Sequence, residues 1–250
     1  MNSKASVTVV TACYNSGATI RQTIESVLHQ TVPCKEYLII DGLSTDDTLD
    51  IAREYVDKFQ EKGIVYQIVS EKDKGIYDAM NKGIRMATGT LIGLLNSDDW
   101  YEPEAVETVL ATYEKEPFDM MYADLNMIQD EKIRGVKRAR LREKYITTRD
   151  WNHPTTFITR EMYGIYQYPL KNVYDDLDVL LKIRRDKRKV VIVNKVLANY
   201  RLGGASNKRS LKNAWYRMRI KYQIYRDNGY SRLYLIEAVG MELGKYLLTK

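Results

Sequence analysis

Short apolar runs rich in β-branched residues alternate with segments of helical periodicity through the first hundred residues. Four runs have the length and composition of strands: Ser6–Thr11, Glu36–Asp41, Ile64–Val69 and Thr90–Leu95, the last of which is expected to be buried. Between the first two, Ile20, Ile24 and Val27 recur on one face of a helix. Strands that alternate with helices favour parallel pairing through right-handed crossovers. The sequence therefore predicts an α/β fold with a mostly parallel, Rossmann-like sheet flanked by helices.

The alternation ends near residue 115, and the chain becomes more basic beyond it. Phe118–Tyr122 and Val190–Val193 have the composition of further strands, with a polar stretch over residues 125–150 between them. The formal net charge is +6, and Lys and Arg dominate residues 132–149 and 182–232. This asymmetry predicts an anionic partner for the C-terminal half.

Two helices are predicted at the C-terminal end, over residues 211–226 and 230–248. The first carries an apolar stripe: Leu211, Ala214, Trp215, Met218, Tyr222 and Tyr225. Such a stripe usually packs onto its own domain. Aromatic residues flanked by basic ones also suit an anionic membrane surface, so both interpretations stay open. We expect a domain over residues 1–207 with a helical extension over residues 208–250.

Composition places the chain among ordinary globular proteins, because 44% of its 250 residues are hydrophobic. It has no apolar run as long as a membrane span, and its first residues lack the apolar segment of a signal peptide. We therefore expect a cytoplasmic protein, with the inner face of the membrane as a candidate docking surface. Cys13 and Cys34 lack the spacing of a metal or redox motif, which predicts buried, reduced thiols.

Polar loops follow the four predicted strands, at the edge where a parallel sheet binds its ligands. The last contains Asn96-Ser97-Asp98-Asp99, and adjacent carboxylates after a buried strand can hold a divalent cation. A turn leading into a helix near Pro103 explains the same residues without a metal.

The loops contain neither of the glycine-rich phosphate-binding patterns GxGxxG and GxxxxGK[ST], which argues against a dinucleotide dehydrogenase and a P-loop NTPase. A nucleotide can be bound without them. Asp41 can accept hydrogen bonds from a base or ribose with Tyr14 beside it, and a metal can bridge the acidic pair to a diphosphate. Asp41-Gly42 alone is more often only a turn.

Taken together, these loops resemble the inverting glycosyltransferases of family 2, which have the GT-A fold. The resemblance rests on four blocks in the same order: Val9–Asn15, Ile39–Thr48, Ser70–Gly83 and Leu94–Tyr101. It covers residues 6–205, and the third block is especially similar to enzymes of bacterial O-antigen and capsule biosynthesis. It implies a hexosyltransferase that moves a sugar from a nucleotide diphosphate donor, expected to be a UDP-sugar, to a saccharide acceptor with inversion. A polyprenyl-diphosphate-linked repeat unit is the implied acceptor, and Mn2+ or Mg2+ the implied cofactor.

The resemblance also implies roles for residues on the donor side. Thr11, Tyr14 and Asp41 are expected to contact the nucleoside, with Asp73 and Lys74 lining the same pocket.

In the acidic loop, Asp98 and Asp99 match the DxD-type motif. The resemblance favours Asp99 for metal coordination and Asp98 for a contact with ribose, with Asp98 as a second metal ligand. Asn96 stands where many relatives have Asp, and an amide oxygen brings no charge to the metal.

On the acceptor side, Tyr174–Lys182 resembles the acidic motif that opens a helix in this family. In that register Asp176 is the catalytic base and Asp175, which precedes it, is a candidate acceptor contact. A carboxylate is ionised at neutral pH and can accept a proton from an attacking hydroxyl. The alternative is that these residues only stabilise the helix N-terminus through its dipole.

His153 and Arg201 are two further candidates for contacts with the diphosphate or the acceptor. Trp151–Phe157 is similar to the acceptor-side strand of the family, and the alternative for His153 within it is a hydrogen-bonded structural histidine. Arg201–Ser206 resembles the loop that closes over the donor, with a plain surface loop as the alternative.

Two other functions compete with this interpretation. A sugar-nucleotide nucleotidyltransferase is expected to carry a basic, glycine-rich loop after its first strand, and residues 11–17 contain no Lys or Arg. A nucleic-acid-binding module leaves the acidic loops unexplained, because their charge repels phosphates. We therefore expect no nucleic-acid partner.

Overall fold

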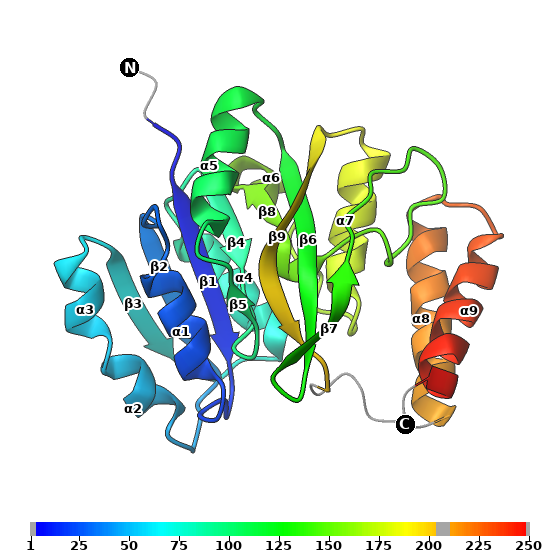
Figure 1. The fold of residues 1–250 in the computed structure, drawn as a ribbon. Helices are drawn as coiled ribbons and strands as arrows, with labels where there is room; N and C mark the ends of the chain where they lie inside the picture. Colours follow the sequence, from blue (N-terminus) through cyan, green and yellow to red (C-terminus); the bar gives the residue numbers. More distant parts are fainter. Residues whose placement is uncertain (1–3, 204–210, 249–250) are drawn as a thin grey trace.

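The computed structural model describes residues 4–203 and 211–248. Its centre is a nine-stranded mixed sheet in the order β3-β2-β1-β4-β8-β6-β9-β5, with β7 paired to β6 (Figure 1). The strands are β1 (Val7–Cys13), β2 (Glu36–Asp41), β3 (Val65–Ser70), β4 (Leu91–Leu94), β5 (Trp100–Tyr101), β6 (Met120–Gln129), β7 (Lys132–Lys137), β8 (Phe157–Thr159) and β9 (Val190–Arg201). The helices are α1 (Ile20–Leu28), α2 (Thr48–Arg53), α3 (Val56–Glu61), α4 (Ile76–Met86), α5 (Ala105–Lys115), α6 (Arg160–Ile165), α7 (Asp175–Arg185), α8 (Leu211–Asp227) and α9 (Tyr234–Leu248), with a 3-10 turn, η1, at His153–Thr155.

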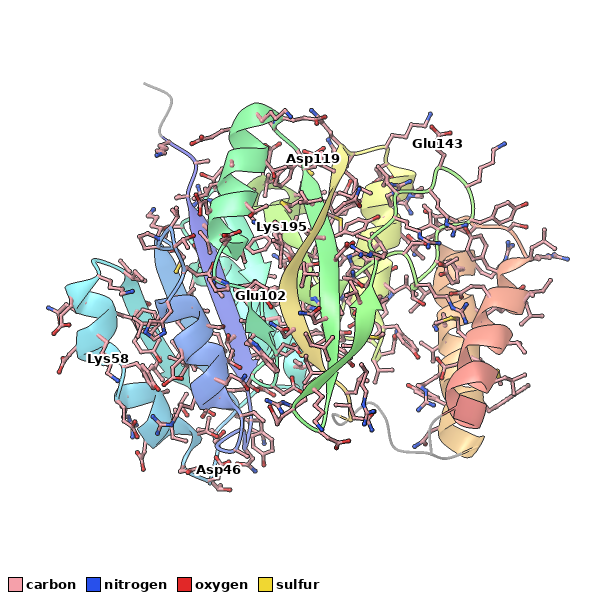
Figure 2. All side chains as sticks on the ribbon, viewed as in Figure 1. Asp46, Lys58, Glu102, Asp119, Glu143 and Lys195 are labelled. Carbon is pink, nitrogen blue, oxygen red and sulfur yellow. The ribbon has the colours of Figure 1, made fainter. Side chains whose placement is uncertain are left out.

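The four strands predicted for the first hundred residues are confirmed as β1 to β4, paired in parallel in the order β3-β2-β1-β4. Helices α1, α3 and α5 cover one face of the sheet, and α4, α6 and α7 cover the other. Burial on both faces explains why β1, β2 and β4 read as continuous apolar runs. Their carboxyl ends lie at one edge, close to the loop that carries Asp46 (Figure 2).

Strands β6 and β9 are longer than the sequence predicts, because both continue through polar residues. They pair in parallel from Met120↔Val190 to Ile128↔Arg201. The amide of Asn126 donates to Asn199 Oδ1 (2.9 Å), and the amide of Asn199 donates to Glu102 Oε1 (2.8 Å). Hydrogen-bonded amides of this kind are tolerated inside a sheet, but they interrupt the apolar pattern that marks a strand.

The C-terminal helices α8 and α9 lie side by side next to α7 and beyond β7 (Figure 1). Tyr225 and Tyr234 are buried with ring centroids 4.2 Å apart, in the same core cluster as the apolar face of α7. The predicted stripe is only partly correct, because Ala214 and Tyr225 are buried whereas Trp215 is 69% exposed. The expected boundary at residues 207 and 208 lies outside the described part of the chain.

Two further expectations can be compared with the structure. Cys13 and Cys34 are buried and free, as predicted. Among the helices of the described residues, none is both long enough and apolar enough to span a membrane.

Candidate functional site

Asp98 and Asp99 follow β4 in a tight loop at the carboxyl edge of the parallel strands. Asp99 is fully buried, and its carboxylate accepts hydrogen bonds from the backbone N–H of Arg201 (3.1 Å) and from the amide of Asn96 (3.3 Å). Burial raises the pKa of Asp98, and burial together with the charge of Asp98 raises the pKa of Asp99 well above its usual range. The fold thus holds two acidic groups together at a cost in electrostatic free energy, which a bound cation would offset.

The oxygens of this loop fit a hard divalent cation. Asn96 Oδ1 is buried and has no hydrogen-bond partner among the described residues, so this oxygen is available to coordinate a cation. Residues 4–203 and 211–248 contain no group of three or more His, Cys, Asp or Glu side chains arranged for a metal. A site with few protein ligands is typical of cations that also bind substrate phosphates and water.

The two aspartates have different environments. Asp99 has no exposed surface and uses both carboxylate oxygens inside the protein, whereas Asp98 is only partly buried. The sequence favours Asp99 as the main metal ligand, but the more accessible carboxylate in the structure is that of Asp98.

Tyr14 and Asp73 meet over Gly42 and form the open part of the expected nucleoside pocket. A Cβ atom at Gly42 would lie 2.5 Å from Asp73 Oδ2 and 3.5 Å from Tyr14 Cδ2, so a larger residue there would displace the Asp73 carboxylate. The Tyr14 ring is 62% exposed and free to stack. Lys74 is exposed beside Asp73, and its backbone N–H donates to Asp78 (3.0 Å).

Asp41 and Thr11 lie below this surface. Asp41 is fully buried and accepts hydrogen bonds from the hydroxyl of Ser70 (2.6 Å) and the backbone N–H of Ser44 (3.0 Å). The Thr11 hydroxyl lies 3.1 Å from Tyr37 Oη in the interior. The Thr11 side chain therefore points into the protein, since both faces of this strand are buried, and the expected contact of Thr11 with the nucleoside stays a prediction.

The nucleoside loop and the acidic loop are directly connected. The hydroxyls of Ser16 and Ser97 lie 2.8 Å apart, and the Thr23 hydroxyl on α1 donates to the carbonyl of Asp99 (2.7 Å). The loops after β1 and β4 therefore form one polar surface, as parallel pairing of these strands requires.

Asp175 and Asp176 open α7 but have separate surroundings. Asp175 is fully buried and accepts the backbone N–H groups of Lys171 (2.9 Å) and Asn172 (3.2 Å), and burial raises its pKa. Asp176 is partly exposed. Asp175 thus shapes the loop before α7, and Asp176 is the carboxylate that a ligand can reach.

Asp176 lies among aromatic and histidine side chains. Burial, and then the charge of Asp176, raise the pKa of Tyr77. Burial lowers the pKa of His153, while the charge of Asp176 acts in the opposite direction. His153 begins η1 and packs against the edge of Trp151, with ring centroids 5.7 Å apart. It is therefore close to the candidate base as well as part of the local packing.

Tyr200 on β9 connects the two acidic groups. Burial and the charges of Asp99, Asp98 and Asp176, in that order of effect, raise the pKa of Tyr200 to about 12. Three carboxylates from loops far apart in the sequence thus act on one phenol. Nothing in the residue pattern singles out Tyr200, because it lies in the part of β9 that the sequence does not predict as strand.

Arg201 is bound within the protein at the acidic loop. Its guanidinium donates to Gln22 Oε1 (2.7 Å) and to the carbonyl of Asp98 (3.3 Å), pairs with Glu131, and lies over the ring of Trp100. It fixes the acidic loop to β9 instead of pointing freely at a diphosphate. Of the expected mobile loop Arg201–Ser206, residues 204–206 lie outside the described part of the chain.

A buried ionic network supports the start of α7. Glu242 on α9 accepts from the hydroxyl of Tyr174 (2.9 Å) and pairs with Arg217 (2.6 Å) and Lys221 (3.3 Å) on α8. Tyr174 directly precedes Asp175 and Asp176. This network is not predicted from the sequence, because the only sign of it there is opposite charge on two helices that pack together.

Comparison with known proteins agrees with this geometry. The family model described as "Glycosyl transferase family 2" matches residues 8–173. The "PGL/p-HBAD biosynthesis glycosyltransferase" of Mycobacterium bovis (strain BCG / Pasteur 1173P2) is 32% identical over 205 residues, covering 80% of this chain and 78% of that protein. The "Putative teichuronic acid biosynthesis glycosyltransferase TuaG" of Bacillus subtilis (strain 168) is 28% identical over 242 residues, covering 95% and 93%.

Solved structures share the fold at low sequence identity. S. aureus TarS 1–349 in complex with UDP-GlcNAc superposes with a TM-score of 0.70 at 16% identity, covering 98% of this chain and 73% of that one. The mannosyltransferase PcManGT from Pyrobaculum calidifontis in complex with GDP-Man and Mn2+ gives 0.66 at 15% identity, covering 99% and 71%. The GT-A fold expected from the sequence is confirmed.

Proposed function

The chain belongs to glycosyl transferase family 2 and is a glycosyltransferase, and we propose that it moves one sugar from a nucleoside diphosphate donor to a saccharide acceptor with inversion at the anomeric carbon. The observation that carries this proposal is the acidic loop after β4, in which the buried Asp99 accepts from the amide of Asn96 and Asn96 Oδ1 has no partner among the described residues. The charges of this loop and of the partly exposed Asp176 also act together on Tyr200. An acidic loop that can hold a cation and diphosphate on one side, and an accessible carboxylate on the other, are the two halves of a single-displacement transfer.

The donor is proposed to be a UDP-sugar bound with Mn2+. Two fold relatives support this assignment, since one was solved with UDP-GlcNAc and the other with GDP-Man and Mn2+. Tyr14 would stack on the base, with Asp73 beside the nucleoside. Asp98, Asp99 and the side-chain oxygen Oδ1 of Asn96 would hold the cation, which when bound offsets the negative charge of the diphosphate. Mg2+ suits the same oxygens.

Asp176 is proposed as the catalytic base. Its carboxylate would accept the proton of the acceptor hydroxyl while the hydroxyl oxygen bonds to the anomeric carbon. The bond from that carbon to the diphosphate oxygen breaks on the opposite side, and the electron pair leaves with the diphosphate. One such displacement inverts the configuration. Asp175 would keep α7 in place, and His153 would contact the acceptor or the diphosphate beside Asp176.

The acceptor is proposed to be a cell-surface saccharide carried on a polyprenyl diphosphate. The printed names of two relatives refer to PGL/p-HBAD and teichuronic acid biosynthesis. A lipid-linked acceptor requires docking at the membrane, and α8 and α9 expose Trp215 (69%) and Ile236 (72%) for such a contact. Co-sedimentation with anionic vesicles that weakens in Trp215→Ser but not in Val56→Ser, an exposed position on α3 at the other end of the molecule (Figure 1), would support Trp215 as a membrane contact. No binding by the wild type would return the acceptor to soluble saccharides.

Substitution of Asp176 tests the catalytic assignment. Asp176→Asn is expected to lower sugar transfer by about 100-fold or more while donor affinity stays unchanged, because a positioned base contributes on that scale. Release of UDP from a panel of UDP-sugars, with acceptor and Mn2+, measures transfer; calorimetry measures donor affinity.

Asp178→Asn is the matched control, because it removes another charge from the first turn of α7. Asp178 pairs with Lys182 (2.7 Å) and accepts from Asn228 (2.7 Å), so its carboxylate is used within the protein. If the acidic residues only stabilise the helix N-terminus, both variants lose the same small amount of activity. Equal losses would remove Asp176 from the mechanism.

A further inference from the structure

An arginine-lined hollow lies in the basic stretch 132–149, which the proposed reaction does not use. Its volume is about 440 Å3, and its walls include Arg138, Arg140, Arg142 and Arg149 together with Tyr145 and Asp150. The hollow lies between the end of β7 and the loop that follows. Figure 2 labels Glu143 on this loop, at the opposite end of the molecule from the carboxyl-edge loop of Asp46. The hollow is therefore separate from the donor site.

Two of the four arginines are neutralised inside the protein. Arg138 pairs with the buried Asp124 (2.6 Å), and Arg142 pairs with the buried Asp150 (3.1 Å). The side chain of Arg140 forms no hydrogen bond or ion pair with any residue in ranges 4–203 and 211–248. Arg149 Nε contacts only a weak acceptor in this region, the Sδ atom of Met241 (2.7 Å).

The charges around the hollow leave the net charge of its lining positive. Glu237 on α9 approaches the loop at Thr148, whose hydroxyl donates to Glu237 Oε1 (3.4 Å). Burial raises the pKa of Glu237, an effect that the positive charges of Lys221 and Arg149 partly offset. The two neutralised arginines therefore line the wall, and the guanidiniums of Arg140 and Arg149 remain available to an anion.

The backbone around the arginines is fixed, so the hollow is a built site. The N–H of Ala139 donates to Asp124 Oδ1 (2.7 Å), and the hydroxyl of Tyr122 donates to the carbonyl of Arg140 (2.9 Å). The N–H of Arg140 donates to the carbonyl of Asp150 (2.9 Å), which closes the loop onto itself. The fold thus holds Arg140 and Arg149, which have no carboxylate partner among the described residues, beside the paired Arg138 and Arg142, and a bound anion would relieve the repulsion between the two unpaired charges.

We propose that this hollow binds a phosphate ester, with Arg140 and Arg149 as its principal ligands. A guanidinium offers two parallel N–H donors to phosphate oxygens, and paired arginines suit a dianion or a diphosphate better than a single carboxylate. A volume of about 440 Å3 lies within the usual range for small-molecule sites, so there is room for the ester group as well as the phosphate. The site stands apart from the proposed sugar transfer and does not depend on it.

Inorganic pyrophosphate is the probe that tests the site. Calorimetry on the full chain in EDTA is expected to detect binding that weakens with salt and falls by about tenfold or more in Arg140→Gln and in Arg149→Gln. Without a cation the Asp98–Asp99 loop repels pyrophosphate, so Asp98→Asn should bind it as the wild type does. Arg134→Gln, on β7 ahead of the hollow, is the control, because Arg134 pairs with Asp130 (3.1 Å) and does not line the hollow.

Vesicles separate the two sources of such an ester. Co-sedimentation with phosphatidic acid in phosphatidylcholine, lost in Arg140→Gln and displaced by pyrophosphate, supports a lipid headgroup. Pyrophosphate binding without vesicle binding supports a soluble phosphate ester.

Two results would overturn the proposal: no pyrophosphate binding by the wild type, or the same loss in Arg134→Gln as in Arg140→Gln. Sugar transfer to a soluble acceptor should be unchanged in Arg140→Gln. Failure of transfer in the wild type would count against the proposed function alone.

Discussion

Removal of the Glu242 carboxylate should destabilise the whole protein, because Glu242 is the acidic centre of a buried network. Glu242 has no exposed surface and Lys221 is 1% exposed. The carboxylate contacts Lys221 (3.3 Å), Arg217 (2.6 Å) and the hydroxyl of Tyr174 (2.9 Å). Glu242→Ala therefore removes the anion from two cations that have little access to water.

The expected loss in the free energy of unfolding is about 3–5 kcal/mol, the usual cost of breaking a buried ion pair from one side. Most of that cost is the desolvation of Lys221 and Arg217, which keep little access to water without their anion, rather than the lost attraction. A domain is stable by about 5–15 kcal/mol in total, so the loss is a large fraction. Removing the charges together, in Lys221→Met with Glu242→Leu, should cost less than Glu242→Ala alone, although Arg217 and Tyr174 still lose a partner.

Urea denaturation followed by circular dichroism measures this loss as a lower midpoint at unchanged slope. Glu54→Ala is the control, because Glu54 pairs with Arg21 at the surface (2.7 Å) and should change stability little. If Glu242→Ala is no more destabilising than Glu54→Ala, the network does not stabilise the fold, and its contact with Tyr174 does not support the start of α7.

Three further predictions concern the cation, the phenol between the acidic groups, and pH. Asp98→Asn and Asp99→Asn should both reduce the thermal stabilisation given by Mn2+ with UDP. Only Asp99→Asn should also alter the metal-free melting temperature, since Asp99 alone is fully buried. Equal melting temperatures of the two variants without metal would contradict the distinct environments of the two aspartates. Tyr200→Phe should lower transfer more than it lowers stability, measured by UDP release and urea denaturation, because the charges of Asp99, Asp98 and Asp176 all act on its hydroxyl. Unchanged transfer would exclude Tyr200 from the proposed site. Burial raises the pKa of Glu237 in the folded state, so stability that is present below about pH 4.3 is lost as the pH rises through the folded pKa. Glu237→Gln should therefore be more stable than the wild type at pH 7 and equal to it near pH 4 in urea denaturation; a less stable variant at pH 7 would be contrary to this sign.

The strands and the acidic loop could be predicted from the sequence because local rules determine them. Strands β1, β2 and β4 are continuous apolar runs, and Asp98 and Asp99 follow the last of these runs directly. Parallel pairing then places the loops after these strands at one edge, whatever the details of packing. The sequence predicts too short a strand at β9 because contacts between residues far apart in the sequence determine the length of β9. Asn199 is acceptable within the sheet only because Asn126 and Glu102 complete its hydrogen bonds, and neither partner is close in sequence.

The direction of a side chain was the other quantity that the sequence did not determine. Thr11 and Asp41 both end up buried, although each resembles a residue that contacts the nucleoside. For Asp175 and Asp176 the register of one residue decides which carboxylate is exposed, and the backbone N–H groups of Lys171 and Asn172 settle it in favour of Asp176. These are contacts of loops whose shape depends on the whole fold.

The C-terminal helices belong to the same structural unit as the candidate catalytic base. Tyr225 on α8 packs in the core cluster of α7, and its hydroxyl donates to the carbonyl of Ile146 (3.3 Å). Glu242 on α9 holds Tyr174, next to Asp175. Deletion of residues 211–250 would therefore expose the apolar face of α7 and release the start of that helix. A loss of membrane binding after such a deletion would not identify a membrane contact, whereas single substitutions at exposed positions such as Trp215 leave the α7 contacts in place.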